Sequence, residues 1–147
     1  MRYKQAENYV AIAMETAVDQ ETGNITVRRV TCAHDCGLVV NPDGLRNQIE
    51  GCILQTLSRT LHEEVQFDKS KVTSVDWVRY PILKFSEAPA VEVALIDKPT
   101  LPPIGAGEAA TAPVAAALAN SIFDATGVRL RNVPFTAQRM KQAFARA

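Results

Sequence analysis

The strongest folding signal in the sequence is a long run of apolar residues that recur three or four positions apart. The run fits one face of a helix with 3.6 residues per turn, and its members are Leu45, Ile49, Cys52, Ile53, Leu57, Leu61 and Val65. Asn41 is a favourable N-cap before it, and Pro42 suits the first helical position, where its missing N–H is harmless. The pattern predicts an amphipathic helix of about five turns. Any fold of this chain must bury that apolar face.

Strands are predicted on both sides of this helix. Positions 10–18 alternate between apolar and polar residues, positions 25–32 are rich in β-branched residues, and a polar stretch lies between them, so a β-hairpin is expected. The apolar phase shifts between Val27 and Val30, which predicts a bulge or a change of face. Further β-like pieces occur at 74–78 and at 91–96.

Two shorter helices are predicted near the C-terminus. An alanine-rich helix is expected to begin near 109–112, with Pro113 in its first turn, and to end at Gly127. A last helix is expected after Thr136 as N-cap, with a hydrophobic staple formed by Phe135 and Met140. The predicted fold class is therefore α+β, a β-hairpin and mixed strands packed with about three helices. The proline-rich stretch 98–103 is the only candidate linker, so 1–147 is expected to be one unit.

Composition excludes several function classes. The chain has 16 Lys and Arg residues against 16 Asp and Glu residues, so it lacks the basic balance that nucleic-acid binding needs. The hydrophobic fraction of 47% argues against disorder. No apolar run approaches the roughly 18–20 residues of a membrane span.

The three cysteines, Cys32, Cys36 and Cys52, argue against a disulfide framework. They are also too few for a self-contained iron–sulfur cluster, which usually takes four. His34 stands between Cys32 and Cys36, so a small metal module is an alternative. It is the least favoured, because the segment has the pattern of a strand and turn and no fourth ligand stands at zinc-like spacing.

Two segments could carry chemistry. In Gly105-Ala106-Gly107-Glu108 the glycines allow close approach to a ligand, and the following helix N-terminus suits an anion. The helix dipole would keep Glu108 ionised, as a general base requires. Gln48 offers an acceptor and two donors, suited to the edge of a heterocycle. Each has a plain structural alternative: a glycine turn before a helix, and a solvated polar helix face.

The ordered motifs of the chain resemble the C-terminal part of the molybdopterin-binding large subunit of the xanthine dehydrogenase/aldehyde oxidase family, above all the isoquinoline 1-oxidoreductase and nicotinate dehydrogenase type. The resemblance extends from about Tyr9 to Phe144. Its motifs are Asp35-Cys36-Gly37, Asn41-Pro42, Gln48-Ile49-Glu50-Gly51, Tyr80-Pro81-Ile82, Pro103-Ile104-Gly105-Ala106-Gly107-Glu108 and the segment from Ala117 to Ile122.

The resemblance implies a role for each candidate residue. Glu108 corresponds to the catalytic glutamate, acting as general base on a molybdenum-bound hydroxide. Gln48 corresponds to a residue that contacts the pterin, and Gly105, Ala106 and Gly107 to the backbone that lines it. The implied reaction is oxidation of an N-heteroaromatic or an aldehyde, with water as the oxygen source. No side chain ligates the molybdenum in this family.

The resemblance also implies what must accompany the chain. The cofactor would be molybdopterin with molybdenum, as the cytosine dinucleotide form, shared with the remainder of the large subunit. Iron–sulfur clusters would lie on a partner chain, with a cytochrome or FAD subunit as a further electron carrier. The expected compartment is the cytoplasm, or the periplasm for an exported complex. Because family subunits are several times longer, residues 1–147 are expected to be a C-terminal fragment, inactive alone. The alternative is a non-catalytic structural or interaction module that retains the family fold.

Overall fold

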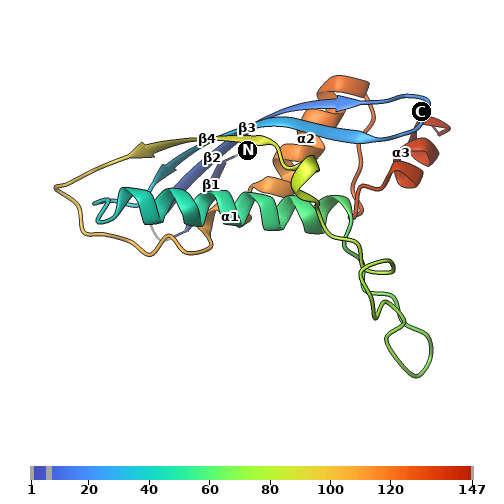
Figure 1. The fold of residues 1–147 in the computed structure, drawn as a ribbon. Coiled ribbons are helices and arrows are strands. Elements are labelled where there is room, and N and C mark those ends of the chain that lie inside the picture. Colours follow the sequence, from blue (N-terminus) through green and yellow to red (C-terminus); the bar gives the residue numbers. More distant parts are fainter. Residues whose placement is uncertain (1, 6–7, 147) are drawn as a thin grey trace.

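The computed structural model describes residues 2–5 and 8–146, with side chains from Asn8 onward. Its strands are β1 (Arg2–Gln5), β2 (Asn8–Val18), β3 (Ile25–Asp35) and β4 (Ala90–Ile96). They form a four-stranded sheet in the order β1-β2-β3-β4. The first three strands are antiparallel, whereas β4 runs parallel to β3 (Figure 1). The predicted hairpin and the strand at 91–96 are confirmed.

The predicted irregularity in the second strand of the hairpin is a β-bulge. Glu15 pairs with Arg29, and the next residue, Thr16, pairs with Val27, so Arg28 is the extra residue. The bulge lets Val27 and Val30 both be buried although they are three positions apart.

Helix α1 (Pro42–Leu61) is the helix that the apolar spacing predicts. The Asn41 side chain accepts a hydrogen bond from the Gly44 N–H at 2.9 Å, which caps its first turn. The helix ends at Leu61, so the prediction that it continues to Val65 is wrong, and Val65 is exposed. Ser58 Oγ donates to the Glu63 carboxylate, and this local bond turns the chain away from the helix axis.

Two further α-helices follow, α2 (Val114–Thr126) and α3 (Ala137–Phe144). Short 3₁₀ turns, η1 (Phe85–Glu87) and η2 (Ala109–Thr111), precede β4 and α2. Helix α2 begins later than predicted because Pro113, which has no N–H to donate, separates it from η2. Gly127 ends α2 with a left-handed φ of 73°, and Thr136 caps α3, both as predicted.

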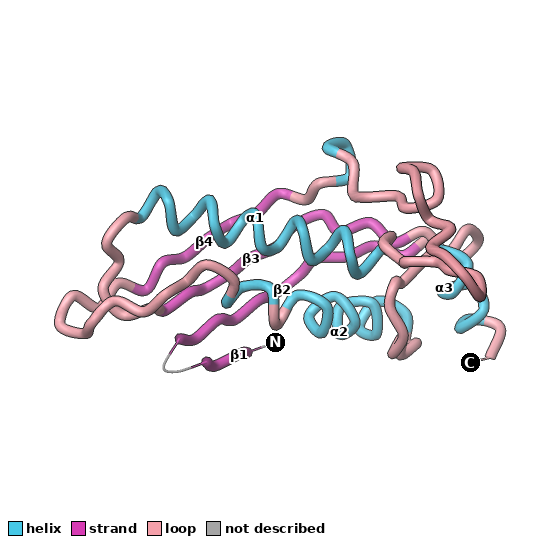
Figure 2. Tube along the Cα trace, turned by 90° about the horizontal axis from the view of Figure 1, so that it is seen from below, coloured by secondary structure: helices cyan, strands magenta, loops and turns pink. Residues whose placement is uncertain are grey.

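One hydrophobic core holds these elements together. Helix α2 packs against β2, and α1 packs against β4 and α2 (Figure 2). Alternate residues of β2 and β3, such as Val10, Ile12 and Cys32, face this core, whereas Ala11 and Ala13 are exposed. The same cluster joins residues before and after 98–103, so that stretch is not a linker between domains. The α+β class is confirmed.

Two other features concern the surface. Residues 74–78 form no strand, contrary to the prediction: the Asp76 side chain accepts hydrogen bonds from the Val78 and Arg79 N–H groups and makes a turn instead. Within the described ranges, no helix has the length and apolarity needed to cross a membrane.

Candidate active site

The segment Gly105–Glu108 lies against the first half of α1, as close to Gln48 as the two motifs require. The Gly107 carbonyl oxygen accepts hydrogen bonds from Gln48 Nε2 at 3.3 Å and from Cys52 Sγ at 3.2 Å. Gln48 and Cys52 are four residues apart and therefore share a face of the helix. The structure thus brings together all the residues that the sequence singles out.

A second anchor holds the other end of this segment. Asn8 Nδ2 donates to the Gly105 carbonyl oxygen at 3.0 Å, and Asn8 Oδ1 lies 2.7 Å from His34 Nε2. With the Asn8 amide oriented in this way, His34 must donate from Nε2. Both side chains are buried, so the network is part of the core.

The carbonyl groups of Gly105 and Gly107 are thus directed into the protein, and the segment presents its other groups outward. Among the described residues, none accepts a hydrogen bond from the N–H groups of 105–108. A Cβ added at Gly105 would meet open space. Ala106 packs against the core. A row of free N–H donors beside open space fits a group that carries phosphates and a heterocycle edge.

The carboxylate of Glu108 is exposed and makes no hydrogen bond or ion pair within the described part of the chain. It lies close enough to Cys52 to act on that thiol: burial, and then the Glu108 charge, raise the pKa of Cys52. Cys52 therefore stays a neutral donor to Gly107. Burial, with a contribution from Cys52, likewise raises the pKa of Cys32 to about 11.

The electrostatic setting of Glu108 differs from the one that the sequence predicts. Glu108 precedes the three-residue turn η2, and α2 begins six positions later at Val114. A single 3₁₀ turn has too few aligned peptide units for a strong dipole. The prediction that an α-helix dipole acts on Glu108 is therefore wrong, and its freedom from internal partners is what leaves it available as a base.

The alternative of a metal module at Cys32, His34 and Cys36 has no geometric support. Cys32 and His34 are buried on the core face of β3. Of the residues whose side chains are described, no three His, Cys, Asp or Glu side chains are grouped so that they could hold a metal ion.

Residues 97–104 form a strap that leads from β4 into the candidate site. Lys98 Nζ lies 2.5 Å from Asp35 Oδ2, and this contact is the main cause that lowers the pKa of Asp35. Backbone bonds join Lys98 N to Gly37 O at 3.0 Å and Ile104 N to Cys36 O at 2.8 Å. The strap is thereby fastened at both ends, directly before Gly105.

The profile of the molybdopterin cofactor-binding domain family matches residues 2–89 of the chain. The chain belongs to this family. This cofactor-binding domain is 48% identical over 136 residues to one subunit of nicotinate dehydrogenase from Pseudomonas putida, and the match covers 92% of this chain and 12% of that protein. It is 32% identical over 126 residues to the beta subunit of isoquinoline 1-oxidoreductase from Brevundimonas diminuta, and that match covers 86% and 16%.

Among solved structures, quinoline 2-oxidoreductase from Pseudomonas putida 86 has a TM-score of 0.87 and 26% identity. The match covers 94% of this chain and 19% of that one. The resemblance to the xanthine dehydrogenase family is confirmed. The chain spans only 12–19% of the length of these relatives.

Sequence reasoning missed two residues of the molybdopterin cofactor-binding domain that position its glycine-rich segment. Cys52 could have been found, because it stands four residues after Gln48 on the predicted helix. Asn8 had no local signal: it reaches Gly105 only because β2 is placed beside the segment, 97 positions apart in the chain.

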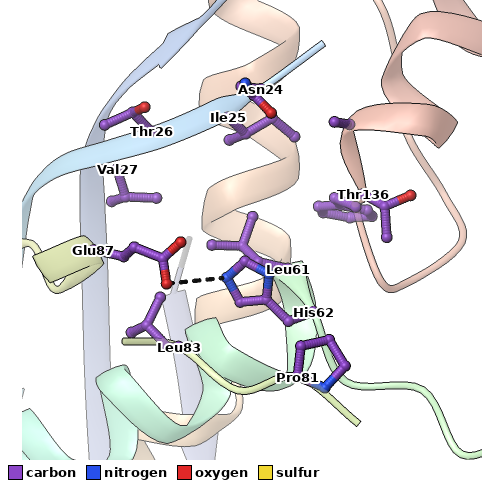
Figure 3. A pocket seen from close by; sticks show the side chains of 12 residues that line it. Asn24, Ile25, Thr26, Val27, Leu61, His62, Pro81, Leu83, Glu87 and Thr136 are labelled. Carbon is purple, nitrogen blue, oxygen red and sulfur yellow. Dashed lines mark ion pairs between the residues drawn. The ribbon is translucent and has the colours of Figure 1, made fainter. Parts of the chain in front are cut away.

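A cavity near the other end of α1 lacks the candidate residues. This cavity of about 440 Å³ lies between the start of β3, the end of α1 and the start of α3. Figure 3 shows His62 and Glu87 facing each other there, with 4.0 Å between Nε2 and Oε2. Gln48 lies about 20 Å along the helix from Leu61, so the cavity is separate from the candidate active site.

We expect the stability of the chain to fall as the pH decreases through about 6.5, because of His34. Burial lowers the pKa of His34 from its ordinary value of 6.5. The unfolded chain therefore binds a proton more readily than the folded one, and the free energy of unfolding decreases as the pH falls. Asp35 contributes only below its ordinary pKa of 3.8. Urea unfolding at pH 7.5, 6.5 and 5.5 measures the slope, and an equal slope in His34→Gln would contradict the assignment.

Proposed function

We propose that this chain forms one wall of the cofactor site in the large subunit of a molybdenum hydroxylase and supplies its catalytic base. The observation that carries the proposal is the exposed, unpartnered carboxylate of Glu108 beside the segment 105–107, whose carbonyl groups are held by Asn8, Gln48 and Cys52. Membership of the molybdopterin cofactor-binding family supports it.

The residues of the chain would divide the work between binding and proton transfer. The bound molybdenum cofactor supplies the two-electron oxidation. The N–H groups of Gly105, Ala106 and Gly107 bind its outer edge, and Gln48, which uses only its N–H₂ group on Gly107, offers its carbonyl oxygen. Glu108 accepts the proton of the attacking water-derived oxygen and holds it on its carboxylate.

The proposed substrate is an N-heteroaromatic compound, with an aldehyde as the second choice. Relatives whose names refer to nicotinate, isoquinoline and quinoline support this order. The proposal includes the cytosine dinucleotide form of the cofactor, an iron–sulfur subunit and a cytochrome or FAD subunit as electron carriers. The compartment is proposed to be the cytoplasm, or the periplasm for an exported complex.

The test is turnover by the complete large subunit, purified with its iron–sulfur partner. Oxidation of nicotinate or quinoline in ¹⁸O-labelled water should give a product that carries the label. Molybdenum measured by elemental analysis should accompany the activity. A complete complex that holds molybdenum but oxidises no heteroaromatic or aldehyde would favour the alternative of a non-catalytic module.

We expect the isolated 147-residue chain to bind little or no molybdenum cofactor and to have no turnover. It spans 12–19% of its relatives, and it carries only two of the segments expected to contact the cofactor. Elemental analysis of the purified chain should therefore find molybdenum far below one atom per chain. Stoichiometric molybdenum would show that this wall alone is a complete site.

A further inference from the structure

The chain has a projecting arm, residues 64–85, that leaves the end of α1 and returns through η1 to β4 (Figure 1). Eight of its residues are large, apolar and exposed, whereas the much longer remainder of the described side chains has five. The eight are Val65, Phe67, Val72, Val75, Trp77, Val78, Ile82 and Phe85. Single exposed apolar residues are normal on a protein surface, but a cluster marks an interaction site.

Local hydrogen bonds give the arm a defined shape. Thr73 N donates to Gln66 O at 2.8 Å, and the Asp68 side chain accepts from the Ser70 and Lys71 N–H groups. At the base, Tyr80 Oη donates to Glu63 Oε2 at 2.8 Å. The arm therefore satisfies polar groups within itself and leaves its apolar side chains uncovered: Trp77 is 73% exposed, Val78 89% and Phe85 98%.

A groove continues this surface at the base of the arm. It has a volume of about 440 Å³ and lies between α1 and the returning chain. Leu54, Ile82, Leu83, Phe85 and Ala88 supply its apolar lining. The arm and the groove share Ile82 and Phe85, so they form one continuous docking surface.

We propose that the arm and its basal groove bind the remaining part of the same molybdopterin-binding subunit. Relatives place the matching segment within proteins of which it is 12–19%, so most of the subunit is available to cover this surface. Covering Phe67, Trp77 and Phe85 would remove roughly 500 Å² from water. This is a large share of the about 800 Å² that one side of a standard interface buries.

The chemistry of the arm favours this permanent partner over other occupants. The arm carries three acidic residues, Glu64, Asp68 and Asp76, against four basic residues, Lys69, Lys71, Arg79 and Lys84. This near balance gives little attraction to an anionic lipid surface, which needs a basic cluster. Permanent interfaces are more apolar than transient ones. The proposed docking rests on family membership and on the arm, and not on the role of Glu108.

Val78 offers a sharp test, because its side chain contacts solvent in the chain alone. Val78→Asp should lower the melting temperature of the complete subunit by roughly 5 °C, since it buries an unpaired charge. The same substitution should leave the melting temperature of the 147-residue chain unchanged. Val78→Ile is the matched control and should be neutral in both. No effect of Val78→Asp in the complete subunit, or an equal effect in the isolated chain, would overturn the proposal.

Cross-linking identifies the occupant. A photo-reactive residue placed at position 77 of the complete complex should form cross-links to other parts of the same polypeptide. Cross-links to the iron–sulfur subunit or to a second copy would overturn the proposed partner. Sedimentation of the complete complex with phosphatidylglycerol vesicles, lost in Val78→Asp, would assign the arm to a membrane instead and would equally overturn it.

Discussion

In the complete subunit, Glu108→Gln is expected to lower kcat by roughly 10²–10⁴-fold, which is the usual contribution of a general base. Glutamine has nearly the same shape as glutamate, but its amide cannot accept the proton. Because the Glu108 side chain makes no hydrogen bond within the described residues, the substitution breaks no internal contact. The molybdenum content and the melting temperature should therefore stay close to those of the wild type.

Steady-state kinetics and elemental analysis on the same preparation separate the two roles that Glu108 could have. Glu21→Gln, at the exposed turn of the hairpin, is the matched control and should leave kcat unchanged. Loss of activity in proportion to loss of molybdenum would make Glu108 a binding residue. A kcat within about threefold of the wild type would remove it from the reaction altogether, because a general base contributes far more than that.

Local signals were sufficient for much of the fold. The apolar spacing from Leu45 to Leu61 and the cap at Asn41 are properties of neighbouring residues, and α1 follows them closely. The bulge in β3 was visible in the phase of Val27 and Val30. The predictions failed where tertiary contacts decide: alternation at 74–78 gives no strand, because no described strand lies beside it to pair with.

The candidate site was predicted in part, for a similar reason. Gln48 and Glu108 stand in motifs, and the resemblance could place them although local chemistry could not. The contacts that position the glycine-rich segment join residues far apart in the chain, such as Asn8 with Gly105 and Cys52 with Gly107. Nothing in the spacing of Asn8 or His34 indicated this network, since His34 has the same pattern as a core residue or a metal ligand.

The strap suggests how the fold fixes the position of Glu108. Asp35 and Lys98 pair at one end, and Ile104 bonds to Cys36 at the other. Gly37 lies between these contacts with a φ of 76°, a conformation that costs other residues about 1–2 kcal/mol. A Cβ at Gly37 would stand 2.2 Å from the Pro102 carbonyl oxygen, far inside van der Waals contact. Only glycine allows the strap to approach β3 this closely.

Gly37→Ala is therefore expected to destabilise the chain by about 3 kcal/mol or more, adding the backbone cost to the displacement of Pro102. Gly127→Ala is the matched control: its φ is 73°, but nothing lies within 4 Å of the added Cβ, so only about 1–2 kcal/mol is expected. Urea unfolding of the two variants measures the difference. Equal costs would show that the strap yields easily to the added methyl group.

The same pair of variants tests whether the strap positions the base. In the complete subunit, Gly37→Ala should move the strap and the segment 105–108 with it, and a displacement of about 1 Å can lower kcat by roughly 10²-fold. Gly127→Ala, at the end of α2, should leave kcat unchanged. If Gly37→Ala destabilises the protein but the folded enzyme keeps its kcat, the strap stabilises the fold without positioning Glu108.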